Sequence, residues 1–145
     1  MDNVIQKSGI QPENIWGGPE VKTLTFSNDT GTVSLFTVTG AVRVRVVGHC
    51  TTNVASAAAA NIEMGVSGDT DAMIASTLAT DIDANEWWHD ASPDSNIEAT
   101  DVFRDYIICN GDDVILTLDA QVDSGVIAFY AYWMPLSSDG AVAAA

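Results

Sequence analysis

The chain has 145 residues, five Lys and Arg against twenty Asp and Glu, a formal net charge of −15, and 47% hydrophobic residues. This length fits one domain with a single core, and the hydrophobic content excludes a disordered acidic tail. Because negative charge repels polyphosphates, we expect no binding to nucleic acid.

The first residues are relevant to targeting and to contacts with other molecules. They lack the charged-then-apolar pattern of a signal peptide, and no apolar run reaches the ~18 residues of a membrane span, so we expect a soluble protein with no membrane partner. Residues 1–20 show no helical or strand period and include Gly17-Gly18-Pro19. They predict an extended N-terminal arm, long enough at ~65 Å to reach a neighbouring molecule, with a frayed terminus as the alternative. Trp16 would be unusual in water, and is therefore a candidate partner contact.

The body of the protein is predicted to be a β domain over residues 21–137. Residues 21–26 and 32–38 alternate apolar and polar side chains around a turn at 28–31, which predicts a hairpin. Residues 42–46 then alternate most clearly, with three valines inward and Arg43 and Arg45 outward. Two interpretations of this Arg pair remain open. The two arginines pair with acidic residues on an adjacent strand of the same sheet, which is the favoured interpretation, or with acidic residues of a partner subunit.

The middle of the chain is less regular. The small residues at 51–60 suggest a connection, whereas Ile62, Met64 and Val66 resume strand spacing. Residues 72–83 fit a helix or a strand, and the Ser and Thr content favours extended structure. Residues 86–89 predict a short strand that ends in a loop at 91–95.

The last forty-odd residues predict three strands, at 102–109, 114–120 and 126–133, separated by turns at 110–112 and 123–125. The final strand is apolar or aromatic on both faces, so it needs cover on each side, either from a second sheet or from another subunit. Its candidate interface residues are Phe129, Tyr130, Tyr132 and Trp133. Residues 138–145 predict a flexible C-terminal tail.

Eight or nine short strands with regular turn signals predict an all-β, antiparallel β-sandwich that is jelly-roll-like. Cys50 falls on the inward face of its strand, and free buried thiols are the favoured reading of both cysteines, although a bridge to Cys109 remains open.

The sequence offers little catalytic chemistry. Two Asp-x-Asp pairs, at 69–71 and 81–83, lack the remaining ligands of a calcium loop and fit solvated acidic loops better. His49 and Cys50 should point to opposite faces of a strand, which argues against a zinc site. No nucleophile motif is present. We therefore expect a protein that is not an enzyme and has no catalytic, cofactor-binding or metal-binding residues.

Trp87 and Trp88 raise a second possibility, because an indole can stack on a sugar ring. Adjacent strand residues face opposite ways, so at most one of them serves a given surface. Packing in a core or interface is the better account of the pair.

Several segments resemble small structural proteins of tailed-bacteriophage virions. The resemblance spans residues 60–137 and rests on Val66-Ser67-Gly68-Asp69-Thr70-Asp71, Ile74-Ala75-Ser76-Thr77, Asp81-Ile82-Asp83, Trp87 before Ala91-Ser92-Pro93, and the closing run 125–137. It implies a capsid decoration (cement) protein located on the capsid surface and made in the host cytoplasm. Such a protein binds the major capsid protein as a homo-oligomer, a dimer or trimer, and braces the shell. The alternative is a carbohydrate- or receptor-binding β-sandwich module of a tail, fibre or head-surface protein.

Overall fold

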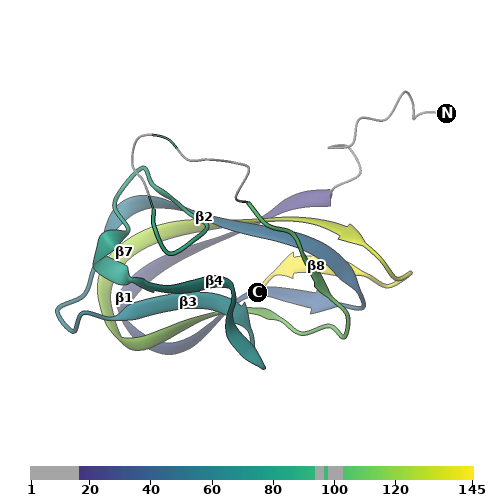
Figure 1. The fold of residues 1–145 in the computed structure, drawn as a ribbon, viewed down its shortest axis with the longest axis horizontal. Helices are drawn as coiled ribbons and strands as arrows, with labels where there is room; N and C mark the ends of the chain where they lie inside the picture. The colour runs from purple at the N-terminus through teal and green to yellow at the C-terminus, as the bar shows by residue number, and fades with distance from the viewer. Residues whose placement is uncertain (1–16, 94–96, 98–102) are drawn as a thin grey trace.

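The computed structural model describes residues 17–93, 97 and 103–145. They form an all-β fold with one antiparallel sheet of eight strands, shown in Figure 1. The elements of the described residues are β1 (Gly17–Thr39), β2 (Val42–Ala55), β3 (Asn61–Val66), β4 (Asp69–Leu78), the 3-10 turn η2 (Ala79–Asp81), β5 (Trp87–Trp88), β6 (Tyr106–Ile108), β7 (Val114–Pro135) and β8 (Ala141–Ala144).

Two very long strands organise the sheet. β1 has 23 residues and β7 has 22, and they pair from Gly17↔Trp133 to Phe36↔Val114. The first half of β7 has β3 as its other neighbour, while the second half has β2. Both long strands curve strongly in Figure 1, so the sheet folds over and its two halves enclose the core.

The core is one cluster to which both halves of the folded sheet contribute. Its largest fully buried side chains are Trp88, Phe36, Phe129, Leu35, Ile62, Met64, Ile74, Ile82, Leu116, Ile127, Val42 and Val44. Since successive strand residues point to opposite faces, one face of each strand supplies this cluster. The predicted inward valines of residues 42–46 and the strand spacing from Ile62 are both confirmed.

The predicted turns at 28–31 and 123–125 are wrong, because both segments lie inside continuous strands. Asn28 has φ 62°, Gly31 φ 83° and Gly125 φ 130°, and the β1–β7 register shifts between Asp29 and Gly31. Positive φ occurs in bulges as well as in turns. Here Ser27 pairs with Ser124, so the two irregular segments lie close together and the strands bend without reversing. The predicted hairpin is therefore one long bent strand, β1. The last two predicted strands, at 114–120 and 126–133, likewise form one long bent strand, β7.

Four boundaries also differ from the predictions. Residues 51–55 belong to β2, and residues 17–20 of the predicted arm begin β1. Of the predicted strand at 102–109, the structure describes residues 103–109, and within them β6 covers Tyr106–Ile108. The predicted flexible tail contains β8, which pairs with Phe36–Thr39 and buries Val142 to 4% exposure. Backbone pairing with β1 makes this segment a strand although most of its side chains are small. The arm over residues 1–16 lies outside the described residues.

Extended structure is confirmed for the ambiguous middle segment, where β4 continues to Leu78 before the single turn of η2. The short strand β5 is also confirmed, with Trp88 in the core and Trp87 on the outside.

Candidate interaction surface

Aromatic and apolar side chains gather on the outside of the half-sheet formed by β1, β7, β2, β5 and β6. We call this surface the outer aromatic face; it comprises Val21, His49, Trp87, Ile107, Tyr130 and Tyr132. Strand register makes most of them neighbours, because Val21 pairs with Tyr130 across β1 and β7, and His49 pairs with Trp87 across β2 and β5. Ile107 lies on the same face but is paired with Arg43 of β2. The residues of this face alternate with core residues along their strands and therefore point outward.

Much of this face is exposed apolar surface. The exposed fractions are 46% for Val21, 37% for Trp87, 38% for Tyr132 and 63% for Ile107. Single exposed apolar residues are normal on a protein surface, but several side chains grouped on one sheet face are typical of an interaction site.

Three aromatic rings of the face, from β2, β5 and β7, are already packed against each other. The His49 and Trp87 rings stack with centroids 4.5 Å apart and planes 17° apart, and the Trp87 and Tyr130 rings lie 5.8 Å apart at 40°. Because this packing holds the side chains in place, a partner that binds here loses little side-chain entropy.

A basic pair borders the aromatic rings on β2. Arg43 Nη2 lies 2.7 Å from Asp105 Oδ2, and Arg45 Nε lies 2.8 Å from Asp105 Oδ1. Burial raises the pKa of the Asp105 carboxyl, but the hydrogen bonds from the two arginines outweigh burial and hold that pKa below its usual range. The structure therefore pairs both arginines with an acid of the same chain, which lies directly before the adjacent strand β6.

The structure divides the predicted interface residues. Tyr130, Tyr132, Arg43 and Arg45 lie on the outside of the sheet, whereas Phe129 is fully buried and Trp133 packs against the core. Phe129 is therefore corrected to a core position, because it occupies the inward parity of β7, whereas Trp133 shares that parity but is only partly buried. Trp16 lies outside the described residues. Val21, His49 and Ile107 were not among the predicted interface residues. Strand parity alone can place such side chains outward, but only the strand order shows which of them are neighbours.

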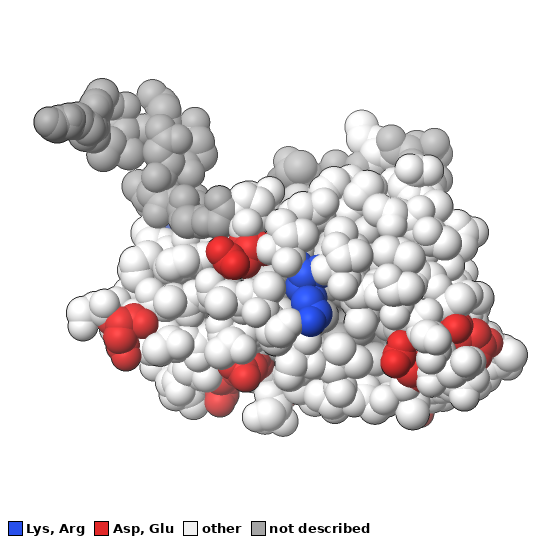
Figure 2. Space-filling view, turned by 180° about the vertical axis from the view of Figure 1, so that it is seen from behind, with Lys and Arg blue, Asp and Glu red and all other residues white. Residues whose placement is uncertain are grey.

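Charged side chains are sparse over part of the surface. Figure 2 shows the view from behind, in which acidic groups are separated by wide uncharged areas. The negative charge is thus dispersed in this view and forms no continuous acidic patch.

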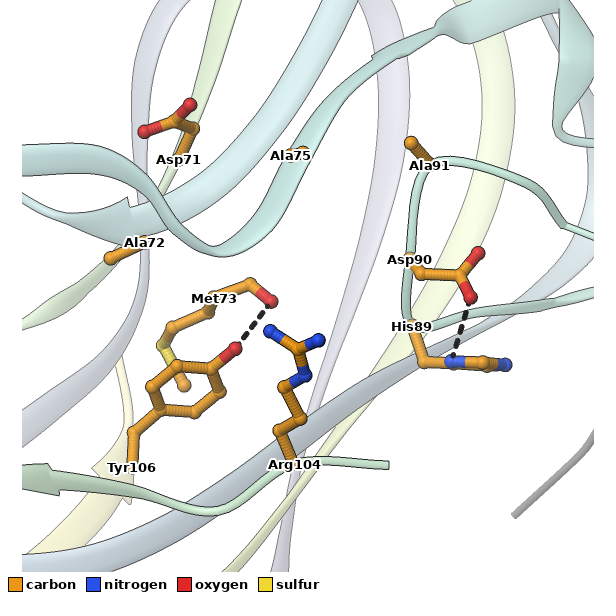
Figure 3. A pocket seen from close by; sticks show the side chains of 9 residues that line it. All are labelled: Asp71, Ala72, Met73, Ala75, His89, Asp90, Ala91, Arg104 and Tyr106. Atoms are coloured by element: carbon orange, nitrogen blue, oxygen red, sulfur yellow. Dashed lines mark hydrogen bonds and ion pairs between the residues drawn. The ribbon is translucent and has the colours of Figure 1, made fainter. Parts of the chain in front are cut away.

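A pocket of about 320 Å³ lies between β4, the residues that follow β5, and β6, as Figure 3 shows. It is lined by Asp71, Ala72, Met73, Ala75, His89, Asp90, Ala91, Arg104 and Tyr106. His89 Nδ1 lies 3.6 Å from Asp90 Oδ2, and the Tyr106 hydroxyl donates a hydrogen bond of 3.1 Å to the Met73 carbonyl. No Ser, Thr or Cys is among these lining residues, and the hydroxyl of Tyr106 already donates its hydrogen to the Met73 carbonyl and not to His89.

The two cysteines are free in the structure. Cys50 lies in the core, as predicted, whereas Cys109 is exposed, which contradicts the favoured reading of two buried thiols. His49 and Cys50 point to opposite sides of β2, as expected from strand geometry. Within the described ranges, no three His, Cys, Asp or Glu side chains gather closely enough to hold a metal ion.

In the part of the chain that the structure describes, no helix has the length and apolar character needed to cross a membrane. Comparison with known proteins yields no matching family model, no matching curated protein and no matching solved structure.

Proposed function

We propose that this protein is a non-enzymatic structural protein of a tailed-bacteriophage virion. The role we assign is that of a capsid decoration (cement) protein, which binds the outer surface of the major capsid protein lattice and stabilises the head. The residues that carry the binding are Trp87, Tyr130, Tyr132 and Ile107 of the outer aromatic face. The folded sheet would then serve as a jelly-roll-like sandwich, with the core between its layers and the binding face on one layer.

The observation that carries this proposal is the exposed, prepacked aromatic cluster that extends over β7, β2 and β5 on the outside of the sheet. Aromatic residues are enriched at the energetically dominant centres of protein interfaces. Repetition over a lattice then turns a modest affinity per site into firm attachment for a homo-oligomer. This role requires no reaction.

The test uses capsids of the same phage from which this protein has been removed. We expect the wild-type protein to bind them and to raise the temperature at which they release DNA or break. A Trp87→Ala variant should bind about thirtyfold more weakly, which corresponds to the ~2 kcal/mol typical of a central aromatic contact. Leu136→Ala is the matched control, because Leu136 is also apolar and 49% exposed but lies beyond β7. Binding that both variants retain in full would refute the proposed face, and failure of the wild-type protein to bind would refute the function.

A carbohydrate-binding module is the second candidate. It is favoured by the 37% exposure of Trp87 beside Tyr130, since an exposed indole can stack on a sugar ring. A glycan array with the wild-type protein and Trp87→Ala decides it. Binding that disappears in the variant supports this candidate, and no binding to any glycan rejects it.

A further inference from the structure

The first half of β1 is an edge strand. β7 pairs with it on one side, whereas β8 reaches only Phe36–Thr39 on the other. Among the described residues, no other strand pairs with residues 19–27, and Pro19, Val21, Thr23 and Thr25 are exposed. An edge of this length presents a row of unpaired backbone donors and acceptors to which another strand can add.

The other described edges are shorter or less regular. β5, β6 and β8 have two, three and four residues. β4 has ten, but its pairing with β3 shifts register twice and its Met73 carbonyl already accepts a hydrogen bond from the Tyr106 hydroxyl. The first half of β1 is therefore the edge best suited to strand addition.

The charged residues on this edge favour a second copy of the chain as its partner. Glu20 and Lys22 share one face of β1, two residues apart, and Glu20 forms no ion pair with any described residue. The Lys22 ammonium donates to the Ala145 carbonyl and keeps further hydrogens for an acceptor. Because Val21 lies between these opposite charges, antiparallel pairing of two copies about Val21 places each Glu20 opposite the other copy's Lys22.

We propose that two copies of this chain form a dimer by antiparallel pairing of their β1 edges, with Val21 on the two-fold axis. Shifting the centre to Thr23 instead places Glu20 opposite Phe26 and Lys22 opposite Leu24, so the charges favour the register centred on Val21. The half-sheets of the two copies join into one sheet. Since Val21 pairs with Tyr130, the two outer aromatic faces become adjacent across the axis. The dimer does not depend on the proposed capsid function.

Charge exchange tests the register. We expect the wild-type protein to sediment as a dimer in analytical ultracentrifugation. Glu20→Lys and Lys22→Glu each create two like-charge pairs across the axis and should raise the dimer dissociation constant by about tenfold or more. An equimolar mixture of these two variants restores both opposite-charge pairs and should form heterodimers, as should the double variant with itself. A monomeric wild-type protein, or variants whose mixture associates no better than each alone, would overturn the proposal.

A cross-linking experiment gives an answer that does not depend on those charges. In a Cys109→Ser background, Val21→Cys places two thiols directly opposite each other, within the 4.4–6.8 Å Cα separation that a disulfide requires. We expect mild oxidation to convert the protein to a covalent dimer. The control is Thr25→Cys, because position 25 of one copy lies far along the strand from position 25 of the other. Failure of Val21→Cys to cross-link, or equal cross-linking of both variants, would contradict the register.

Discussion

The indole Nε1 of Trp88 lies 3.0 Å from the hydroxyl oxygen of Thr77 and donates a hydrogen bond to it inside the core. The adjacent Trp87 points to the opposite side of β5 and stacks on His49. Two neighbouring tryptophans therefore have different roles, one in stability and one on the surface.

This difference predicts opposite outcomes for the two alanine variants. Trp88→Ala should lower the free energy of unfolding by about 3–5 kcal/mol, because it leaves a large cavity in the core. Trp87→Ala should cost about 1 kcal/mol or less, because its side chain is 37% exposed. Urea unfolding followed by circular dichroism measures both. If both variants lost the same free energy of unfolding, the assignment of Trp88 to the core and Trp87 to the surface would be wrong.

Gly125 should be intolerant of any side chain. It has φ 130°, and a Cβ there would lie 2.8 Å from Val54 Cα and 2.9 Å from Asn53 O, both of which are backbone atoms. We expect Gly125→Ala to lower the free energy of unfolding by about 1–3 kcal/mol through backbone strain. Gly68→Ala is the control, because a Cβ at Gly68 meets nothing within 4 Å. If Gly125→Ala left the free energy of unfolding unchanged, β7 would not bend at this glycine as the structure shows.

The two cysteines should differ in reactivity. Burial is the main cause that raises the pKa of the Cys50 thiol to about 11, whereas Cys109 is exposed. At pH 8 a chromogenic disulfide reagent should therefore modify one thiol per native chain at once and the second only on unfolding. Cys109→Ser should abolish the fast phase. If two thiols react fast, Cys50 is not buried. If no thiol reacts until a reductant is added, Cys109 is not free.

Acid should destabilise the protein through identifiable carboxylates. Hydrogen bonds from the Asn61 side chain and backbone N–H lower the pKa of Asp119, and those from the Gln121 side chain and the Ala57 N–H lower the pKa of Asp123. The pKa of Asp105 is also lowered, by its two arginines against the effect of burial.

A carboxyl whose pKa is lower in the folded state contributes stability above its unfolded pKa of about 3.9, and this stability is lost as the pH falls through the folded pKa. The free energy of unfolding should therefore decrease from about pH 5 towards pH 2. Asp119→Asn should reduce the free energy of unfolding at pH 7 but have little effect on it at pH 2. The free energy of unfolding of this variant should therefore depend less steeply on pH than that of the wild-type protein. Identical slopes for the wild-type and variant proteins would exclude Asp119 as a contributor.

The sequence by itself determined the all-β class and the inward face of several strands. The alternation at residues 42–46 and 62–66 is local, because the two-residue period of a strand assigns each side chain to a face whatever its neighbours are. The same rule separated Trp87 from Trp88 and His49 from Cys50 before any tertiary contact was known.

Only the tertiary structure decided how the strands continue and which side chains meet. Gly31 and Gly125 permit positive φ, which suits both a turn and a bulge. Strand pairing decided for the bulge, because the register shifts beside Gly31 in the β1–β7 pair and beside Gly125 in the β2–β7 pair. Asp105 lies at least 60 residues from Arg43 and Arg45, and no local pattern links them. Strand order therefore decides which outward residues form one surface, because sheet pairing joins segments that are distant in sequence.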